Sequence, residues 1–190
     1  MRKVKNFKIN ITVQEISRVI KKLNNVEQLP EEMQRNISKA VRYYLKFLTP
    51  CIIYDTFPKD SLILENEKDI PQKLIAKTVF FAAIGSSLEE EYLKDKNLYG
   101  DDTEKIVSSL AVEALEQSKR FAIRLISNEA EDENCILMRS IEIAPENYEK
   151  LNSLIDIGKI GISYNDGRLN PKYSLCGLSY WIASKKKVKK

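Results

Sequence analysis

The sequence predicts an α+β fold in which a mostly antiparallel sheet is flanked by helices. Three observations support this prediction. Helical periodicity dominates residues 12–48, strand-like and helix-like segments alternate over residues 50–155, and residues 159–182 combine two strand patterns with a turn sequence. Because no internal repeat or low-complexity linker separates these segments, we expect them to share one core.

The length and composition are typical of a single globular domain. The chain has 190 residues, of which 43% are hydrophobic and 31% are charged, and this is enough to bury a sizeable core. We assign residues 1–184 to one domain whose N-terminal part, residues 1–48, is helical. Residues 185–190 contain five lysines and are predicted to form a flexible basic tail. Without this tail the net charge of +4 falls close to zero, which argues against a broad nucleic-acid surface.

Several kinds of site are disfavoured by residue types alone. The chain has no histidine, and Cys51, Cys135 and Cys176 lack the spacing of zinc ligands. We therefore expect no metal site and no catalytic side chain. We expect the three cysteines to be buried as small apolar side chains. An odd number of thiols without a secretory signal is typical of a cytoplasmic protein. No apolar stretch reaches the ~18 residues of a membrane span.

The N-terminal part is predicted to contain a short strand and two helices. Residues Phe7–Ile11 alternate between apolar and polar side chains, as in a strand. Thr12 and Glu15 form the pattern of a capping box, which begins a helix that runs to about Leu23. A second helix begins with Pro30 and two acidic residues and continues to Leu48, before Thr49-Pro50 ends it.

The central part is predicted to contain two strands of the sheet. Residues Pro50–Pro58 form a strand bounded by prolines, and Ser61–Glu65 extend its character. Residues Pro71–Ala76 are expected to form a short helix or a turn. The apolar run Thr78–Gly85 has the length and composition of a central strand that is covered on both faces.

Two further helices and a loop are expected next. A helix begins at Ser86-Ser87, where three glutamates follow in its first turns. The longest helical pattern covers Asp101–Ile126 and contains Glu113 within an apolar stretch. A carboxylate there needs a partner, so Glu113 lies at the rim of the apolar stripe or faces a site. Residues Asn128–Asn134 are acidic and polar and are expected to form a loop.

The C-terminal part is predicted to end in a β-hairpin. A short helix at Glu146–Ile155 precedes a strand at Lys159–Tyr164, and Asn165-Asp166-Gly167 provides turn residues. The returning strand covers Tyr173–Ile182 and is rich in small residues. Small side chains permit close approach either of a ligand or of neighbouring core residues, and the pattern alone leaves both alternatives open.

Four blocks of sequence resemble the activation (reactivation) domain of cobalamin-dependent methionine synthase, in a short free-standing form. Residues 11–20 (ITVQEISRVI) resemble its opening block, and residues 49–58 (TPCIIYDTFP) resemble its proline-led strand. Residues 79–91 together with 108–117 (SSLAVEALEQ) resemble its central strand and long helix, and residues 160–182 resemble its closing segment. The blocks occur in the family's order over nearly the whole chain.

This resemblance implies a fold and a function. The fold is a curved, mostly antiparallel sheet with flanking helices. The implied function is that of a free-standing activation subunit, which binds S-adenosylmethionine and assists reductive remethylation of cob(II)alamin. The cobalamin is held by a partner, either the cobalamin-binding module of methionine synthase or another corrinoid protein, and a flavoprotein supplies the electron. Positioning of the two reactants is the protein's contribution, and the corrinoid supplies the chemistry.

The resemblance also implies site residues. Glu113 matches an acidic position near S-adenosylmethionine, and Arg139 matches the arginine that holds the methionine carboxylate through its planar fork. The two side chains are expected to meet in one cleft, although a structural ion pair between them is an equal alternative. In the closing segment Tyr173, Ser174 and Gly177 are candidates to face the cobalamin.

The segment after Arg139 departs from the family pattern. The family has R-x-x-x-G-Y followed by Pro, whereas this chain has RSIEIAP, which lacks the Gly-Tyr pair and is shorter. Two hypotheses follow. Either the chain is an activation subunit that binds S-adenosylmethionine, or it is a non-catalytic docking module for a corrinoid protein without a ligand of its own.

Overall fold

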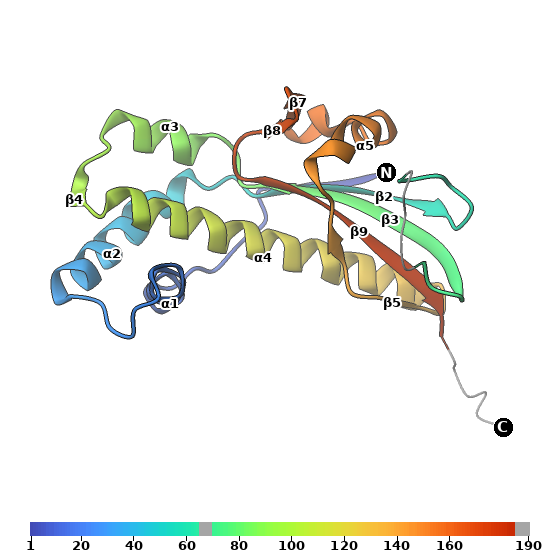
Figure 1. Cartoon of the computed structure of the whole chain (residues 1–190), viewed down its shortest axis with the longest axis horizontal. Helices are drawn as coiled ribbons and strands as arrows, with labels where there is room; N and C mark the ends of the chain where they lie inside the picture. Colours follow the sequence, from blue (N-terminus) through green and yellow to red (C-terminus); the bar gives the residue numbers. More distant parts are fainter. Residues whose placement is uncertain (65–69, 185–190) are drawn as a thin grey trace.

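The computed structural model describes residues 1–64 and 70–184 and contains a curved antiparallel sheet (Figure 1). The strand order is β1-β2-β3-β9-β5, and the short strand β6 also pairs with β9. The bounds are Arg2–Lys5 for β1, Cys51–Pro58 for β2, Leu74–Ala83 for β3, Cys135–Leu137 for β5, Ile141–Glu142 for β6 and Ser174–Ala183 for β9. The predicted α+β class with an antiparallel sheet is confirmed. The predicted lysine tail lies outside the described residues.

Strand β3 is the centre of the sheet. It pairs with β2 on one side and with β9 on the other, and its last seven residues are buried. Phe80 belongs to the core beneath the long helix, whereas Phe81 belongs to the core on the opposite face. The predicted central strand is therefore confirmed, but it begins earlier than expected. The helix or turn predicted for Pro71–Ala76 is wrong in its second half, because Leu74 to Ala76 already belong to β3.

Helix α4, Thr103–Asp132, lies along one face of the sheet (Figure 1). It is longer than predicted, and the loop expected at Asn128–Asn134 is wrong over most of its length. The reason is tertiary packing: Ile126 and Ala130 are one turn apart and are both fully buried against the sheet. This contact outweighs the polar composition of the last turns.

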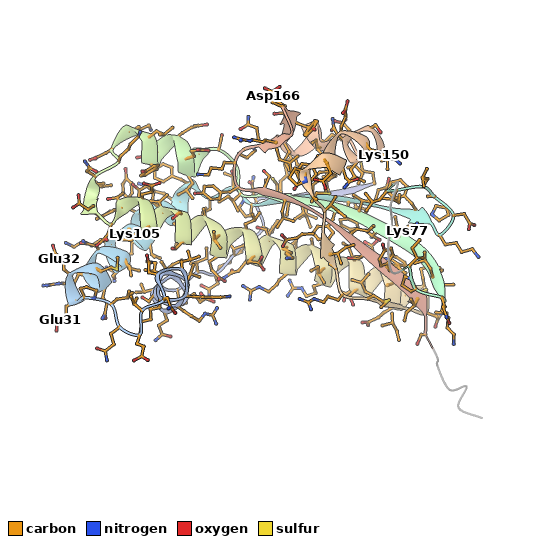
Figure 2. The ribbon with its side chains drawn as sticks, viewed as in Figure 1. Glu31, Glu32, Lys77, Lys105, Lys150 and Asp166 are labelled. Carbon is orange, nitrogen blue, oxygen red and sulfur yellow. The ribbon has the colours of Figure 1, made fainter. Side chains whose placement is uncertain are left out.

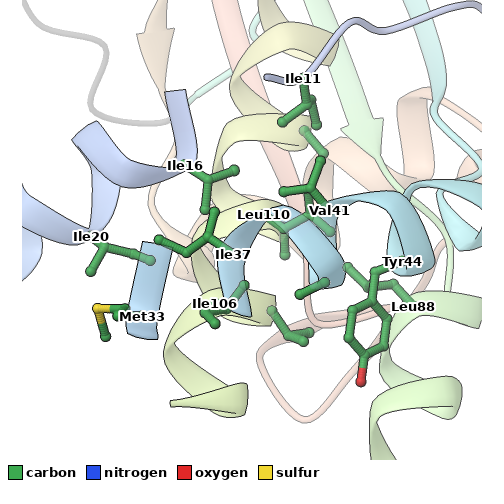
Figure 3. Close-up of a cluster of buried hydrophobic side chains, with 14 of the residues drawn as sticks. Ile11, Ile16, Ile20, Met33, Ile37, Val41, Tyr44, Leu88, Ile106 and Leu110 are labelled. Carbon is green, nitrogen blue, oxygen red and sulfur yellow. The ribbon is translucent and has the colours of Figure 1, made fainter. Parts of the chain in front are cut away.

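A third core joins the N-terminal helices to the first half of α4 (Figure 3). Helix α1, Val13–Asn24, begins with the predicted capping box, in which Thr12 and Glu15 bond each other's backbone N–H. Helix α2, Glu31–Tyr44, follows Pro30 and continues as a 3₁₀ turn, Leu45–Phe47. Both predicted helices are confirmed.

The strand predicted at Phe7–Ile11 is wrong, because the N-terminal strand is β1 at Arg2–Lys5. Strand β1 pairs with β2, and Asn6 then adopts a left-handed conformation with φ of 54°. This bend turns the chain away from the sheet edge. The Phe7 ring instead stacks on Phe121 of α4, with 4.2 Å between ring centroids.

The predicted terminal hairpin pairs differently in the structure. Of the strand predicted at Lys159–Tyr164, the first two residues belong instead to a 3₁₀ helix, Ile157–Ile160, whose two terminal isoleucines are buried. Its last two residues do belong to a strand, β7. The turn at Asp166-Gly167 joins β7, Ser163–Asn165, to β8, Arg168–Asn170, as a separate two-stranded sheet. Strand β9 pairs with β3, β5 and β6 instead.

The remaining elements complete the two ends of the molecule. They are α3 at Ser87–Lys94, β4 at Leu98–Asp101, a 3₁₀ turn at Pro145–Asn147 and α5 at Tyr148–Leu154. The part of Ser61–Glu65 that is described contains no strand. Within residues 1–64 and 70–184, no helix combines the length and apolarity needed to cross a membrane, and no group of potential ligands is arranged to hold a metal ion.

Candidate functional site

Glu113 lies near the middle of α4 and is almost fully buried, with 4% of its surface exposed. Its Oε1 accepts a hydrogen bond from Arg120 Nη2 at 2.7 Å and another from Gln117 Nε2 at 3.2 Å. The three residues are spaced by four and three positions and therefore share one face of the helix. The buried carboxylate thus has its partners within its own helix, which removes the need for a ligand to neutralise it.

Gln117 connects this face of α4 to the segment before α1. Its side chain accepts from Asn10 N–H at 2.9 Å and donates to Asn10 C=O at 2.7 Å. Both backbone groups of one extended residue are therefore satisfied by a single amide. The network from Glu113 through Gln117 to Asn10 holds the N-terminal segment against the helix.

Arg139 lies between β5 and β6 and is exposed. Within the residues that the structure describes, its guanidinium makes no hydrogen bond and no ion pair. The neighbouring segment is well fixed, since Met138 N–H donates to the Tyr180 carbonyl at 2.8 Å and the hydroxyls of Ser140 and Ser179 bond each other. The backbone that carries Arg139 is therefore fixed, and the donors of its guanidinium are available among the described residues.

The structure does not bring Glu113 and Arg139 together. Lys119 pairs with Glu142 of β6, so this face of α4 is the one turned toward the segment that carries Arg139. Glu113 lies about 120° away around the helix at 100° per residue, on the face turned toward Asn10. The expectation that the two side chains meet in one cleft is therefore not met, and the alternative of an ion pair between them is not met either. Arg120 takes the place that Arg139 was expected to fill.

The three candidates in the closing segment have different surroundings. Gly177 is buried, and a Cβ atom added to it would lie 2.3 Å from Cζ of Phe80. The side of Gly177 on which a side chain would lie is therefore covered by a ring of β3, and its contact with a corrin stays a prediction. Tyr173 is half-buried, its carbonyl accepts from Ile84 N–H at 3.3 Å, and burial raises the pKa of its phenol. Ser174 donates to the Pro171 carbonyl at 2.7 Å.

Ser174 also lines a cavity of about 510 Å³ between the start of α3, the β7–β8 hairpin and α5. Its lining includes the charged side chains of Glu89, Arg168 and Lys172, together with the Tyr148 ring. The sequence pattern does not predict this cavity, because it pairs the hairpin with the wrong strand. The feature of the sequence that could have indicated this cavity is the pair of basic residues on either side of Pro171, Arg168 and Lys172.

A row of hydroxyl groups crosses the sheet and ends next to Arg139. Thr56 and Thr78 lie opposite each other in β2 and β3, with 2.8 Å between their oxygens, and Thr78 lies opposite Ser179 in β9. Ser179 then bonds Ser140. The row lies on the face of the sheet that α4 packs against, because Thr78 is two residues from Phe80 and shares its face. The row therefore ends at the residue that follows Arg139 in the sequence.

The thiols do not supply a nucleophile. All three cysteines are free and buried, and burial raises the pKa of Cys176 far above its usual range. A thiol kept protonated in this way is unreactive.

Comparisons with known proteins support the fold. No protein-family model matches the sequence, and no characterised protein matches it by sequence. Among solved structures, the chain is similar to the crystal structure of the MetH reactivation domain bound to AdoHcy (S-adenosylhomocysteine), with a TM-score of 0.62 and 12% sequence identity. The match covers 98% of this chain and 79% of the other. At this level of identity the similarity establishes a shared fold, which is the curved antiparallel sheet with flanking helices.

Proposed function

We propose that this chain is an activation subunit for a cobalamin-dependent methionine synthase, or for another corrinoid methyltransferase. It binds S-adenosylmethionine and presents it to a cobalamin held by the partner module, so that cob(II)alamin is remethylated after reduction by a flavoprotein. The observation that carries this proposal is the fold shared over 98% of the chain with a domain whose structure contains AdoHcy. The sequence blocks that resemble the family support it independently.

The proposed ligand site is the edge of the sheet formed by β5 and β6, beside Arg139. The guanidinium has no partner among the described residues and its segment is fixed, so its fork is free to hold a carboxylate with two parallel hydrogen bonds. Ser140, the next residue in the sequence, anchors this segment through the bond between its hydroxyl and that of Ser179. Glu113 is committed to Arg120 within α4 and is not assigned a contact with the ligand. Tyr173 and Ser174, near the cavity between α3 and α5, remain the proposed contacts with the corrinoid partner.

Isothermal titration with S-adenosylmethionine and S-adenosylhomocysteine tests this site. The Arg139→Gln variant is expected to bind either compound at least about tenfold more weakly, because a charge-assisted bidentate contact is lost. The matched control is Arg42→Gln on α2, which removes an exposed arginine far from the site. Equal affinities of Arg139→Gln and the control would refute the assignment.

The activation function is tested separately with the partner. The cobalamin-binding module is reduced in the presence of S-adenosylmethionine, and the conversion of cob(II)alamin to methylcobalamin is followed by its absorption spectrum. Conversion that depends on this chain and is lost in the Arg139→Gln variant is the expected result. If the spectrum is unchanged with and without the chain, the activation function is wrong.

A second function is favoured by one observation. Glu113 is already satisfied by Arg120, and RSIEIAP replaces the ligand-contacting loop of the family. A docking module that binds a corrinoid protein without S-adenosylmethionine would have both features. Silent titrations combined with a stable complex between this chain and the cobalamin-binding module would favour this second function.

A further inference from the structure

A separate cavity of about 440 Å³ lies on the other flank of α4, between that helix and the segment that precedes α1. It is distinct from the edge that carries Arg139, because it is built on the face of α4 turned toward Asn10. The residues that give it its chemical character are Lys8, Asn10, Glu15, Arg120, Phe121 and Arg124. Three of these six side chains are cationic and one is anionic.

The positive charges of this cavity are incompletely balanced. Among the described residues, Lys8 and Arg124 form no ion pair. The carboxylate of Glu15 accepts from the Thr12 N–H at 2.7 Å and from the Thr12 hydroxyl at 3.0 Å, so it is committed to the start of α1. Arg120 is the one cation of this lining that is compensated, through its contact with Glu113. Arg120 and Arg124 are four residues apart and repel each other in the absence of an anion.

The walls of the cavity are fixed before any ligand binds. The two hydrogen bonds between Gln117 and Asn10 hold the N-terminal segment at a constant distance from α4. The stacked rings of Phe7 and Phe121 make a second contact between the same two segments. The Arg124 guanidinium lies over the Phe121 ring, 5.3 Å from its centroid, which restricts the positions of its donors. A site that is ordered in advance loses little entropy on binding.

We propose that this cavity binds a dianionic phosphate group, carried by a small phosphorylated molecule. Two cations without ion-pair partners among the described residues match the charge of a phosphate monoester, which is close to −2 at neutral pH. The arginine fork fits two phosphate oxygens, and the lysine acts as a point charge on the third. A single carboxylate would leave one of the two positive charges unbalanced. The Phe121 ring provides an apolar surface for the rest of the ligand.

Isothermal titration with inorganic phosphate and with phenyl phosphate, at low ionic strength and near neutral pH, tests the proposal. Saturable binding of both is expected, with phenyl phosphate binding more tightly because its ring contacts Phe121. Arg124→Gln is expected to weaken binding about tenfold or more. Glu113→Gln is expected to strengthen it about threefold, because the charge of Arg120 is then no longer compensated.

Lys105→Gln is the matched control for lost positive charge. Lys105 lies in the first turns of α4 (Figure 2), about 28 Å along the helix from Arg124 at 1.5 Å per residue. Its substitution is expected to leave the affinity unchanged. Absence of saturable binding, or equal weakening by Arg124→Gln and Lys105→Gln, would overturn the proposal. The outcome is independent of the proposed function, since Arg139→Gln is expected to alter the titration with S-adenosylhomocysteine and to leave that with phosphate unchanged.

Discussion

Substitution of Gly177 by alanine tests whether this glycine is required by the core or by a ligand. Gly177 lies in the middle of β9, directly opposite Phe80 of β3. The ring of Phe80 is fully buried between the sheet and the core beneath α4. Because Gly177 has no side chain, the Phe80 ring can occupy the space beside it. If the core requires this glycine, its substitution should lower the stability of the protein.

The size of the loss follows from the distances. An added Cβ would lie 2.3 Å from Cζ and 2.5 Å from Cε1 of Phe80, whereas ordinary carbon–carbon contacts are about 3.5–4.0 Å. The ring must therefore move by more than about 1 Å within a close-packed core. Overpacking of this kind costs about 1–3 kcal/mol in unfolding free energy. For a chain of 190 residues, a loss of about 2 kcal/mol lowers the melting temperature by roughly 4–8 °C.

Urea denaturation and thermal melting of Gly177→Ala, followed by circular dichroism, measure this loss. Gly158→Ala is the matched control, because an added Cβ there meets the Asp156 carboxylate at 3.2 Å and no backbone or ring. It is expected to change stability by less than about 0.5 kcal/mol. Combining Gly177→Ala with Phe80→Leu should recover about 1 kcal/mol relative to the sum of the single changes. Wild-type stability of Gly177→Ala would refute the packing argument and leave a ligand contact as the reason for this glycine.

Three other substitutions have expected outcomes that equilibrium unfolding measures. Thr12→Ala removes the capping box of α1 and should cost about 1 kcal/mol, whereas Thr12→Ser should cost much less. Gly85→Ala should be more damaging, because φ is 78° and the new Cβ would lie 1.8 Å from Oγ1 of Thr49; a near-neutral effect would contradict the close approach of these two residues. Burial raises the pKa of Tyr44 to about 12, so the folded state favours the neutral phenol. This preference contributes fully to the free energy of unfolding below about pH 10, and the contribution is lost as the pH rises from 10 to 12. The Tyr44→Phe variant should lose less stability over this range, and at pH 7 it should be at least as stable as the wild type, because the hydroxyl is buried without a hydrogen-bond partner among the described residues.

Local patterns in the sequence are sufficient to predict the helices and strands that are determined by neighbouring residues. The capping box at Thr12 and the proline at position 30 mark the starts of α1 and α2. The apolar run that forms most of β3 has the length and composition of a strand covered on both faces. In each case the residues that determine the structure lie within a few positions of one another.

Strand pairing and the end of α4 depend on residues that are distant in sequence. The turn at Asp166-Gly167 is visible in the sequence, but the two strands that it joins have only three residues each. The following strand, β9, pairs with the longer strand β3 instead. No local pattern distinguishes these partners, because register is set by which faces are buried. The last turns of α4 likewise form because Ile126 and Ala130 contact the sheet.

The candidate site likewise contains one contact that the local sequence indicates and one position that depends on distant residues. The sequence indicates that Glu113 needs a partner, and Arg120 meets that requirement. The i to i+7 relation between the two is visible in the sequence, since long side chains on a helix lean toward its N-terminus. The sequence does not show that Arg139 lies on the other flank of α4, because that position is set by the pairing of β5 and β6 with β9. The consequence is chemical as well as structural. With Glu113 committed to Arg120, the guanidiniums of Arg124 and Arg139 have no anionic partner among the described residues, which is why we propose a different anionic ligand for each.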